Sequence, residues 1–326
     1  MQTLAQSSTQ SLSTQSLVDP YGRRVRKLRV SLTDQCNLRC QYCMPVDATF
    51  MDPQRYLSPE EYALLVGELL TYGVGEVRLT GGEPLLSRSF DEVLGRLAPL
   101  GIPKLSLTTN GILLDRHCEN LQKAGIQHLN ISLDSLDAEV YKTVTYGNQL
   151  ARVLDNIQLA QSLGFCIKIN MVVMRGINDH EVLNFVDYSQ RTGLEVRFLE
   201  LMRIGYACNT QAERFIPAQT LIERIQAQYH LEPISQPLDS TSFNFTTPAG
   251  AQIGFIASES QPFCGHCSRW RLSADGILRA CLLKDAGIPL RGLSADQRAA
   301  AYQELLGMKP YLRPPEVTHL MHQIGG

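Results

Sequence analysis

Between residues 28 and 200, short segments of β character alternate with segments of helical character. The predicted strands cover residues 28–33, 76–80, 104–109, 128–134, 166–173 and 195–201. Helical character is clearest in "SPEEYALLVGELL", where Ser58 can cap the N-terminus, Pro59 suits the first turn and Glu61 completes a capping box. This alternation is typical of parallel βα folds, because parallel strands need long crossover connections. The sequence therefore predicts a parallel sheet covered by helices.

One face of these predicted strands is polar throughout. In the first strand, Leu28 and Val30 share one face while Arg29 and Ser31 share the other. Parallel strands around a packed interior are normally apolar on both faces, so the polar face should line a lumen that holds water or a large polar ligand. Six strands with such a lining predict an incomplete, open barrel. An antiparallel sheet with one wet face is the alternative, which the helical segments between strands disfavour. The cationic lining residues are Arg29, Arg78, Lys104, Lys168 and Arg197.

The regular alternation stops near residue 205. Beyond it, "SFNFTTPAGAQIGFIA" and "RWRLSADGILRACL" are typical of hairpins. We therefore predict an α/β fold with an open six-stranded βα barrel over residues 21–205 and a smaller α+β domain over residues 206–326. Residues 1–20, "MQTLAQSSTQSLSTQSLVDP", contain no Lys or Arg and no apolar core of a signal peptide, and are predicted to be a disordered leader.

Charge and cysteine content limit the classes of function. A net charge of −2 gives no general attraction to nucleic acid or to an anionic membrane, and no run of 18 apolar residues predicts a membrane span. Nine cysteines without an export signal indicate reduced thiols in a cytoplasmic protein rather than a disulfide framework. Cys118, Cys166 and Cys208 are scattered and are expected to be buried free thiols.

The other cysteines form two groups of three. In "SLTDQCNLRCQYCMP", Cys36, Cys40 and Cys43 follow the first strand, at the edge where barrel enzymes carry their active sites. Three thiolates can hold three irons of a cubane cluster and leave the fourth iron open. A zinc site that recruits a fourth Cys or His fits the same spacing.

The second group lies in "FCGHCSRWRLSADGILRACL". Its members are Cys264, Cys267 and Cys281, and His266 lies between two of them, where it is poorly placed to reach the same metal. A zinc-ribbon fragment is the alternative to a second open cluster.

Two motifs together carry a family resemblance. The cysteine spacing with Tyr42 before Cys43, and "TGGEP" after the second strand, resemble the signatures of radical S-adenosylmethionine (SAM) enzymes and their partial TIM barrel. Over residues 21–326 the chain is similar to the GTP 3′,8-cyclases, the family of molybdenum-cofactor biosynthesis protein A. The similarity also includes "TTNG", "SLDS", "KINMVVMRGINDHE", "VRFLELM", "RWRLSADG" and the terminal "QIGG". It implies a lyase that converts GTP to (8S)-3′,8-cyclo-7,8-dihydro-GTP in molybdenum cofactor biosynthesis.

The resemblance also implies a set of cofactors and site residues. It implies SAM and two [4Fe-4S] clusters, one on each group of cysteines. It assigns cofactor binding to Tyr42, Gly81, Gly82, Glu83, Thr108, Asn110, Ser132 and Met202. Without side chains, Gly81 and Gly82 would let the backbone approach a ligand amino group. It assigns substrate binding to Arg29, Arg78, Lys168, Arg197, Arg269 and Arg271, and catalysis to Arg269, Arg271, Gly325 and Gly326. The two glycines would form a tail that enters the active site, so we expect truncation to abolish turnover but leave both clusters.

The chain departs from the family at three positions. Glu76 stands where Lys is common and would repel phosphate unless it pairs with a neighbouring Arg, and Ser268 and Trp270 stand where Asn and Leu are usual. The implied partners are GTP, an external one-electron reductant and the next enzyme, cyclic pyranopterin monophosphate synthase; a homodimer is an open expectation. Two other functions remain open at this point: a radical SAM enzyme that modifies a peptide or small molecule, and a non-enzymatic two-zinc scaffold.

Overall fold

The parallel strands of the predicted barrel form the centre of one long curved sheet. The computed structural model describes residues 16–315, 317 and 319–325. Within them, six strands lie side by side in chain order and all run parallel. They are β1 (Lys27–Ser31), β2 (Glu76–Thr80), β3 (Lys104–Thr109), β4 (His128–Ser132), β5 (Cys166–Val173) and β6 (Glu195–Glu200). The predicted open barrel is therefore confirmed, with strand ends within two residues of the expected ones.

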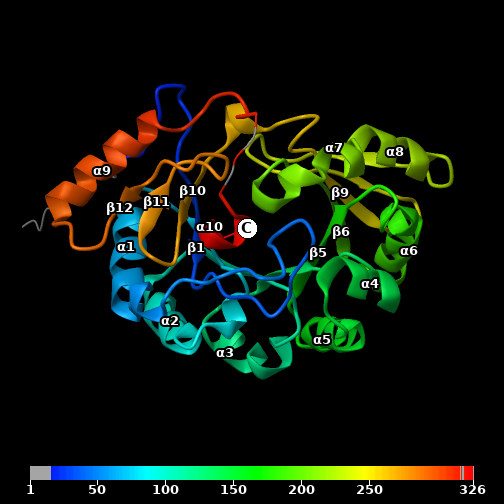
Figure 1. Ribbon diagram of the computed structural model, residues 1–326, viewed down its shortest axis with the longest axis horizontal. Helices are drawn as coiled ribbons and strands as arrows, with labels where there is room; N and C mark the ends of the chain where they lie inside the picture. The colour runs from blue at the N-terminus through cyan, green and yellow to red at the C-terminus, as the bar shows by residue number, and fades with distance from the viewer. Residues whose placement is uncertain (1–15, 316, 318, 326) are drawn as a thin grey trace, which may run out of the picture.

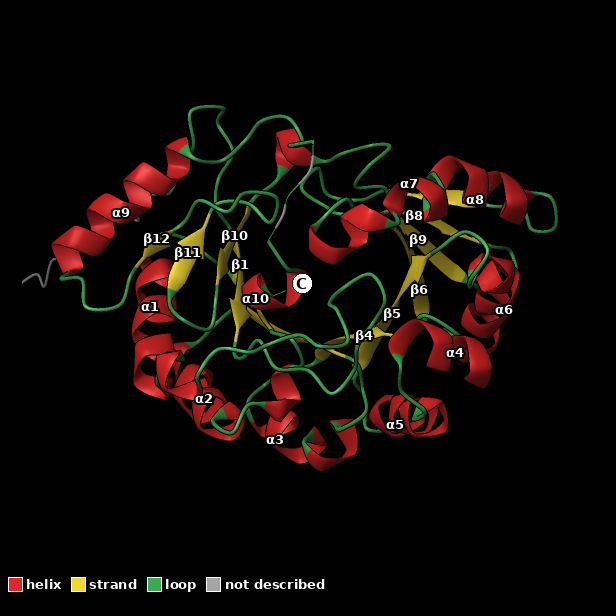
Figure 2. Ribbon diagram, in the orientation of Figure 1, coloured by secondary structure: helices red, strands yellow, loops and turns green. Residues whose placement is uncertain are grey.

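Helices cover the outer face of this arc, as Figures 1 and 2 show. They are α1 (Pro59–Thr71), α2 (Phe90–Leu97), α3 (Cys118–Lys123), α4 (Ala138–Thr145), α5 (Leu150–Ser162) and α6 (Val182–Thr192). The predicted capping box at Ser58 and Glu61 starts α1. Apolar strand residues such as Leu28 and Val77 are fully buried with Tyr62 and Leu65 of α1 in one core, because burial of both apolar faces removes them from water.

The C-terminal third of the chain extends the sheet at both edges. Strand β10 (Arg269–Leu272) pairs in parallel with β1, and β9 (Gln252–Ile256) pairs in parallel with β6. The two predicted hairpins are present as β8 (Phe243–Thr246) with β9 and β10 with β11 (Ile277–Arg279). The remaining elements are β7 (Glu232–Ile234), β12 (Ile288–Pro289), α7 (Gln211–Arg214), α8 (Ala218–Gln226), α9 (Ala295–Gly307) and α10 (Met321–Ile324). The boundary placed near residue 205 follows β6, and the division into two domains there stays an interpretation.

Two sequence-based expectations need correction. Residues 16–20, assigned to the leader, belong to the fold: Leu17 is buried, and Asp19 forms a buried ion pair of 2.6 Å with Arg23. Residues 1–15 lie outside the described residues. Cys118 is buried, as expected. Cys166 is exposed instead, because it is the first residue of β5 and lies at the end of the strand. Cys208 is only partly buried. In the described part of the chain, no helix combines the length and apolar content needed to cross a membrane.

Candidate active site

A cavity inside the arc brings together most of the predicted site residues. Its lining includes Arg29, Cys36, Cys40, Tyr42, Cys43, Arg78, Gly81, Gly82, Glu83, Thr108, Asn110, Ser132, Arg197, Met202, Cys264, Cys267, Arg269, Arg271 and Cys281. Both groups of cysteines therefore face one space, although more than 220 residues separate them along the chain. Lys168 is not part of this lining, and Gly326 lies outside the described residues.

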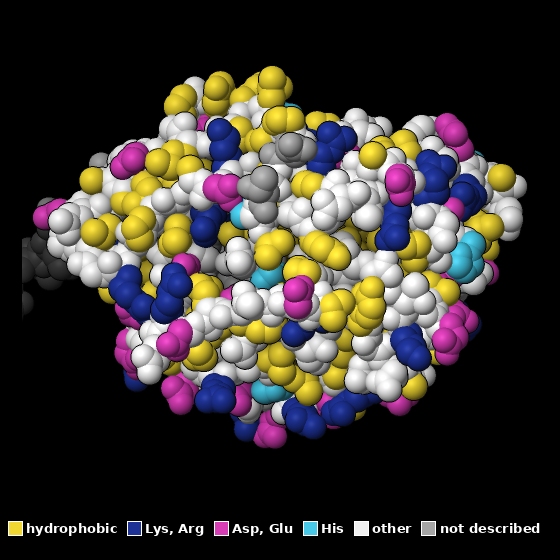
Figure 3. All heavy atoms as spheres, viewed as in Figure 1, with side chains coloured by type: hydrophobic (Ala, Val, Ile, Leu, Met, Phe, Trp, Pro, Cys, Tyr) yellow, Lys and Arg dark blue, Asp and Glu magenta, His cyan; other side chains and the backbone are white. Residues whose placement is uncertain are grey.

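Three arginines form a row across neighbouring strands. In the sheet register, Arg29 of β1 is the partner of Arg271 of β10 on one side and of Arg78 of β2 on the other. Side chains that are register partners in a sheet point to the same face. On the molecular surface shown in Figure 3, basic and acidic side chains are interspersed. The row is thus an internal concentration of positive charge rather than part of a basic surface patch.

The electrostatics of this row favour a bound anion. Burial, followed by the charges of Arg271 and Arg78, lowers the pKa of Arg29 well below its ordinary value. Burial and Arg269 lower the pKa of Arg271 to about 9, and burial and Arg78 lower that of Arg197 to about 10. Among the described residues, no carboxylate lies within ion-pair distance of Arg29, Arg269 or Arg271. Arg271 is buried and Arg29 and Arg269 are half-buried. Cations removed from water without counter-charges are costly, so a polyanion would relieve their mutual repulsion.

The acidic departure at Glu76 is paired. Its Oε1 lies 3.3 Å from Nη2 of Arg78, and its Oε2 lies 3.9 Å from Nζ of Lys104. An acidic group at this position was expected to repel phosphate unless it paired with a neighbouring Arg, and Glu76 does pair with Arg78. This pairing also means that Arg78 shares its charge with a carboxylate.

Lys168 is placed differently from the predicted arginines, and like Lys104 it is absent from the cavity lining. Its Nζ lies 2.7 Å from Oε2 of Glu195, and its side chain is 44% exposed. In the register, Lys168 pairs with Glu195, whereas Asn170 pairs with Arg197. Lys168 therefore lies one layer below Arg197 along the strands, which explains why it does not reach the cavity.

The first cysteine loop is held by hydrogen bonds to its backbone. Arg39 donates from Nη1 to the carbonyl of Cys36 at 2.8 Å, and the amide of Arg39 donates to the carbonyl of Thr145 at the end of α4. Tyr42 donates from its hydroxyl to Oδ2 of Asp134 at 2.8 Å. Tyr42 is therefore fixed at the cavity wall by a carboxylate from the segment that follows β4.

The first three thiols are free and lie close enough to affect one another. Burial, with the charge of Glu83, raises the pKa of Cys36 to about 11, and burial with the charge of Cys36 raises that of Cys43 to about 12. Such thiols lose their protons when a cationic metal centre is bound. In the described residues, no three Cys, His, Asp or Glu side chains are arranged to hold a single metal ion. The donor set, three thiols facing a cavity, fits a cubane cluster with one open iron.

Gly81 and Gly82 connect the loop after β2 to the first cysteine loop. The amide of Gly82 donates to the carbonyl of Thr33 at 2.7 Å. A Cβ added at Gly81 would lie 2.6 Å from that carbonyl oxygen, and one at Gly82 would lie 2.3 Å from the carbonyl oxygen of Gln35. The sequence predicted that these glycines let the backbone approach a ligand. The structure shows a further reason, because without side chains they allow the loop after β2 to pack against the backbone of residues 33–35.

Glu83 connects the loop after β2 to the end of β3 through hydrogen bonds. It is buried, and its carboxylate accepts hydrogen bonds from the amide of Asn110 and the hydroxyl of Thr109, both at 2.7 Å, and from the amide of Leu85 at 3.1 Å. Burial raises its pKa to about 7 despite these donors. The motifs "TGGEP" and "TTNG" are thus joined through one carboxylate.

The second cysteine group lies near β10, the strand next to β1, but at the opposite end of the strands from the first group. Cys264 and Cys267 precede β10, and Cys281 follows β11. Burial opposes ionisation of Cys267, but the charges of Arg269 and Lys309 lower its pKa to about 6. The donor set is again three free thiols at the cavity.

The structure accounts for both unusual residues beside this group. Ser268 donates from its hydroxyl to Oδ2 of Asp239 at 2.7 Å, which ties the β7–β8 loop to the start of β10. Trp270 is fully buried on the opposite face of β10, where its ring lies 6.3 Å from that of Tyr302 in α9. Neither side chain therefore lies on the face of β10 that carries Arg269 and Arg271.

The C-terminal tail enters the arc of strands. Figure 1 shows α10 within the arc, close to β1. Arg271 donates from Nη1 to the carbonyl of Gly325, and a Cβ at Gly325 would lie 2.8 Å from Cγ2 of Thr80 and 3.0 Å from Cβ of Ser31. Gly325 is therefore seated against β1 and β2 in space that only a glycine fits.

Two residues near the cavity were missed by the sequence analysis. His322 of α10 lines the cavity and is 1% exposed, and neither ring nitrogen has a hydrogen-bond partner among the described residues. Lys309, after α9, is 4% exposed and contacts Cys267. Neither residue belongs to a recognisable spacing pattern, so only the fold could reveal them.

Sequence comparisons relate most of the chain to known proteins. Residues 30–189 match the Radical SAM superfamily, and residues 194–317 match a family described as Molybdenum Cofactor Synthesis C. The GTP 3′,8-cyclase of Synechocystis sp. is 59% identical over 311 residues, which is 95% of each chain. That of Geobacter sulfurreducens is 40% identical over 317 residues, covering 94% of this chain and 97% of the relative.

The comparison of structures supports the fold. SuiB of Streptococcus suis, solved with bound S-adenosylmethionine, superposes with a TM-score of 0.66 at 14% identity, covering 88% of this chain and 68% of SuiB. Its complex with the precursor peptide SuiA gives a TM-score of 0.65, also at 14% identity, over 90% of this chain and 69% of that one. At this identity the similarity concerns the arrangement of strands and helices alone.

Proposed function

This chain belongs to the GTP 3′,8-cyclase family, and from that premise we propose that it converts GTP to (8S)-3′,8-cyclo-7,8-dihydro-GTP in molybdenum cofactor biosynthesis. The premise rests on 59% identity over 95% of the chain to a relative of that name. We assign the enzyme to the lyases, because the 7,8-dihydro product implies that the new C3′–C8 bond forms by addition across the C8–N7 double bond of the purine.

The internal row of arginines is the observation that carries this proposal. Arg271, Arg29 and Arg78 lie on one face of three adjacent strands. A triphosphate is a polyanion, and Arg binds phosphate oxygens with paired, charge-assisted hydrogen bonds. An enzyme acting on an uncharged substrate would have no use for such a concentration of buried positive charge.

We propose that the six clustered cysteines hold two [4Fe-4S] clusters and that SAM binds at the first. The first would be held by Cys36, Cys40 and Cys43, and the second by Cys264, Cys267 and Cys281. The three free thiols of each group support this assignment. Once bound, the first cluster and SAM would supply the radical chemistry that acts on the ribose. Tyr42, Gly81, Gly82, Glu83, Thr108, Asn110, Ser132 and Met202 would surround SAM, and all of them line the cavity.

The chain's own residues position the substrate and shield it from water. Arg29, Arg78, Arg197, Arg269 and Arg271 would bind the triphosphate and balance its charge. Because the two cysteine groups open into one cavity, GTP would lie between them with its guanine toward the second group. Holding the reacting carbons of one molecule in a fixed orientation lowers the entropic part of the barrier. Lys168 remains a predicted contact, which would require it to leave Glu195.

Gly325 and Gly326 would complete the site from the C-terminal side. Gly325 is held by Arg271 next to the arginine row. A tail without side chains leaves room for substrate while it adds backbone donors and acceptors. We propose that this tail closes the cavity around the phosphates.

Partners and location follow from the same proposal. The reaction requires an external one-electron reductant, and its reactive product suits direct transfer to the next enzyme, cyclic pyranopterin monophosphate synthase. Nine free thiols are in keeping with the cytoplasm. A homodimer remains compatible with the proposal. Nucleic acid and membrane are not among the proposed partners, since the clustered cations line the internal cavity and basic and acidic side chains are interspersed on the surface in Figure 3.

The test combines metal analysis with turnover. Anaerobically reconstituted protein is assayed for iron and sulfide, and dithionite, SAM and GTP are then added for detection of 5′-deoxyadenosine and the cyclised nucleotide by mass spectrometry. About eight irons per chain, as two four-iron clusters require, together with both products, would support the proposal. Deoxyadenosine without cyclised GTP would reject the substrate, and zinc without iron or sulfide would reject the radical chemistry altogether.

A further inference from the structure

A buried lysine lies against the second group of cysteines. Lys309 follows α9 and is 4% exposed. Its Nζ lies 3.4 Å from Sγ of Cys267, 2.7 Å from the carbonyl oxygen of Arg269 and 2.9 Å from that of Ala280. An ammonium group has three N–H donors, and each of the three has an acceptor here. The geometry therefore matches the protonated form of the lysine.

The three acceptors connect the two segments that carry the thiols. Cys267 lies two residues before Arg269 at the start of β10, and Ala280 directly precedes Cys281 after β11. Lys309 therefore bridges both segments from behind the cavity. Among the described residues, no carboxylate lies within ion-pair distance of its Nζ. The sulfur of Cys267 is thus the group in contact with this ammonium that would carry negative charge once a metal centre is bound.

The buried side chain of Arg23 binds the backbone of Lys309. Arg23 donates from Nη2 to the carbonyl of Lys309 at 3.1 Å, and from Nη1 to the carbonyls of Pro310 at 2.8 Å and Cys264 at 2.6 Å. Arg23 is itself paired with Asp19. The backbone at Lys309 is therefore anchored to the N-terminal segment and to the segment that carries Cys264.

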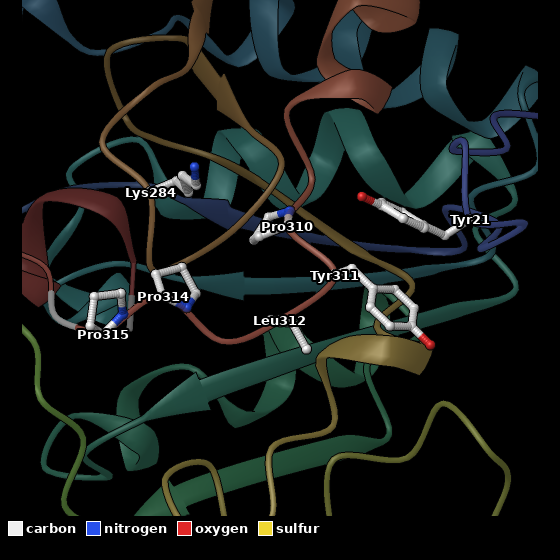
Figure 4. Close-up of a pocket in the computed structure, with 7 residues that line it drawn as sticks. All are labelled: Tyr21, Lys284, Pro310, Tyr311, Leu312, Pro314 and Pro315. Carbon is white, nitrogen blue, oxygen red and sulfur yellow. The ribbon is translucent and has the colours of Figure 1, made fainter.

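The neighbouring lysine shows a contrasting environment. Lys284 follows Cys281 by three residues but is exposed, and Figure 4 shows it beside a surface pocket with Pro310 and Tyr311. Water screens the charge of an exposed ammonium, whereas a buried one acts through a low effective dielectric constant. Lys284 is closer to the thiols in the sequence, yet Lys309 is therefore expected to have the larger effect on a metal centre.

We propose that Lys309 is a positioning residue that acts as the fixed counter-cation of the second cluster and raises its reduction potential. The inference rests on the proposed [4Fe-4S] cluster at Cys264, Cys267 and Cys281. Reduction adds one electron to the cluster, so a nearby cation stabilises the reduced form more than the oxidised form. Hydrogen bonds to ligand sulfur atoms shift the potential in the same direction.

The experiment compares Lys309→Met, Lys309→Arg and Lys284→Met with the wild type in the full-length, anaerobically reconstituted protein. Iron and sulfide are counted first, and each cluster is then titrated with reductant and followed by electron paramagnetic resonance. Lys309→Met should shift the potential of the second cluster to more negative values and leave the first unchanged. Lys309→Arg, which keeps the charge, should remain near the wild type, and Lys284→Met should change neither cluster.

Each outcome decides the matter. Unchanged potentials in Lys309→Met with full iron content would overturn the inference. Loss of four irons in Lys309→Met but not in Lys309→Arg would support it, because Arg keeps the positive charge and N–H donors that Met lacks. Loss in both variants would overturn it in favour of a purely steric role. A wild type that binds only four irons would instead reject the second cluster itself, and that failure is visible before any variant is compared.

Discussion

Arg271 donates a hydrogen bond from its Nη1 to the backbone carbonyl of Gly325. The same arginine is the register partner of Arg29 in the row that faces the cavity. The C-terminal tail is therefore attached to the proposed phosphate site by one of the side chains that form it. A substrate that recruits Arg271 would alter this contact, so tail position and substrate binding should be coupled.

Gly325→Ala should reduce turnover at least tenfold while iron content stays at the wild-type level. The added Cβ would lie 2.8 Å from Cγ2 of Thr80 and 3.0 Å from Cβ of Ser31, so the tail would have to move. The measurement is product formation per cluster-loaded enzyme. Removal of Gly325 and Gly326 should have the larger effect with the same iron content.

Gly292→Ala is the matched control for this variant. Gly292 has a φ of +78°, close to the +75° of Gly325, but a Cβ there would meet nothing within 4 Å. Both substitutions carry a backbone cost of about 1–2 kcal/mol, and only Gly325→Ala should affect turnover. Equal losses in the two variants would attribute the effect to stability and not to the tail.

Glu76→Gln should tighten GTP binding by up to about tenfold, which corresponds to about 1.4 kcal/mol. The substitution removes a negative charge next to the phosphate site and frees Arg78 from its 3.3 Å ion pair. Equilibrium binding of GTP to the reconstituted protein measures the effect. Glu60→Gln, which disrupts the exposed pair with Arg96, serves as control. Weaker binding in Glu76→Gln would mean that the carboxylate orients Arg78 and does not compete with the ligand.

Gly82→Ala should abolish the first cluster and SAM binding but spare the second cluster. A Cβ at Gly82 would lie 2.3 Å from the carbonyl oxygen of Gln35 and 2.6 Å from that of Asp34, which would force the two loops apart. We expect about four irons per chain instead of eight. Gly95→Ala in α2 is the control, because its Cβ would meet nothing within 4 Å and alanine favours a helix. Full iron content in Gly82→Ala would show that the loops can separate without loss of the cluster.

The alternation along the strands predicted which face of the sheet is polar. It did not predict how far along the barrel axis each polar side chain lies. Arg29, Arg78 and Arg197 line the cavity as expected from their phase, whereas Lys168 shares the phase and does not. The register places Lys168 beside Glu195 and one layer below Arg197. Alternation within one strand carries no information about the stagger between strands, and this stagger determines which cations share a layer.

The motifs predicted the cysteines and the glycines of the site, but not the contacts that hold them. Glu83 was expected near SAM, yet both of its oxygens are occupied by Thr109, Asn110 and Leu85. Lys309 is brought to Cys267 by a segment more than 40 residues away, with Arg23 as its anchor. Such contacts depend on tertiary packing and leave no spacing pattern in the sequence.

Asp239→Asn should destabilise the apoprotein by about 1–2 kcal/mol at pH 7, and this difference should vanish at low pH. Asp239 lies 2.9 Å from Arg26 and 3.0 Å from Lys27, and accepts a hydrogen bond from Ser268. Burial opposes ionisation, but the hydrogen bonds from Ser268 and Lys27 and the two positive charges lower the pKa of the Asp239 carboxyl to about 2. The expected loss is smaller than the full pKa shift would give, because Arg26 is 57% exposed and its charge is screened.

The sign of the pH dependence follows from the lowered pKa. In the unfolded chain an Asp carboxyl titrates near about 3.9, so between about pH 4 and pH 2 the unfolded state binds more protons than the folded state. The stabilisation is present in full above pH 4 and is lost as the pH falls through the folded pKa of about 2. Urea unfolding of wild type and variant at several pH values measures it, with Asp155→Asn on the exposed side of α5 as control. A difference in stability that stays constant from pH 7 to pH 2 would mean that the asparagine packs poorly against Ser268 and that charge is not the cause.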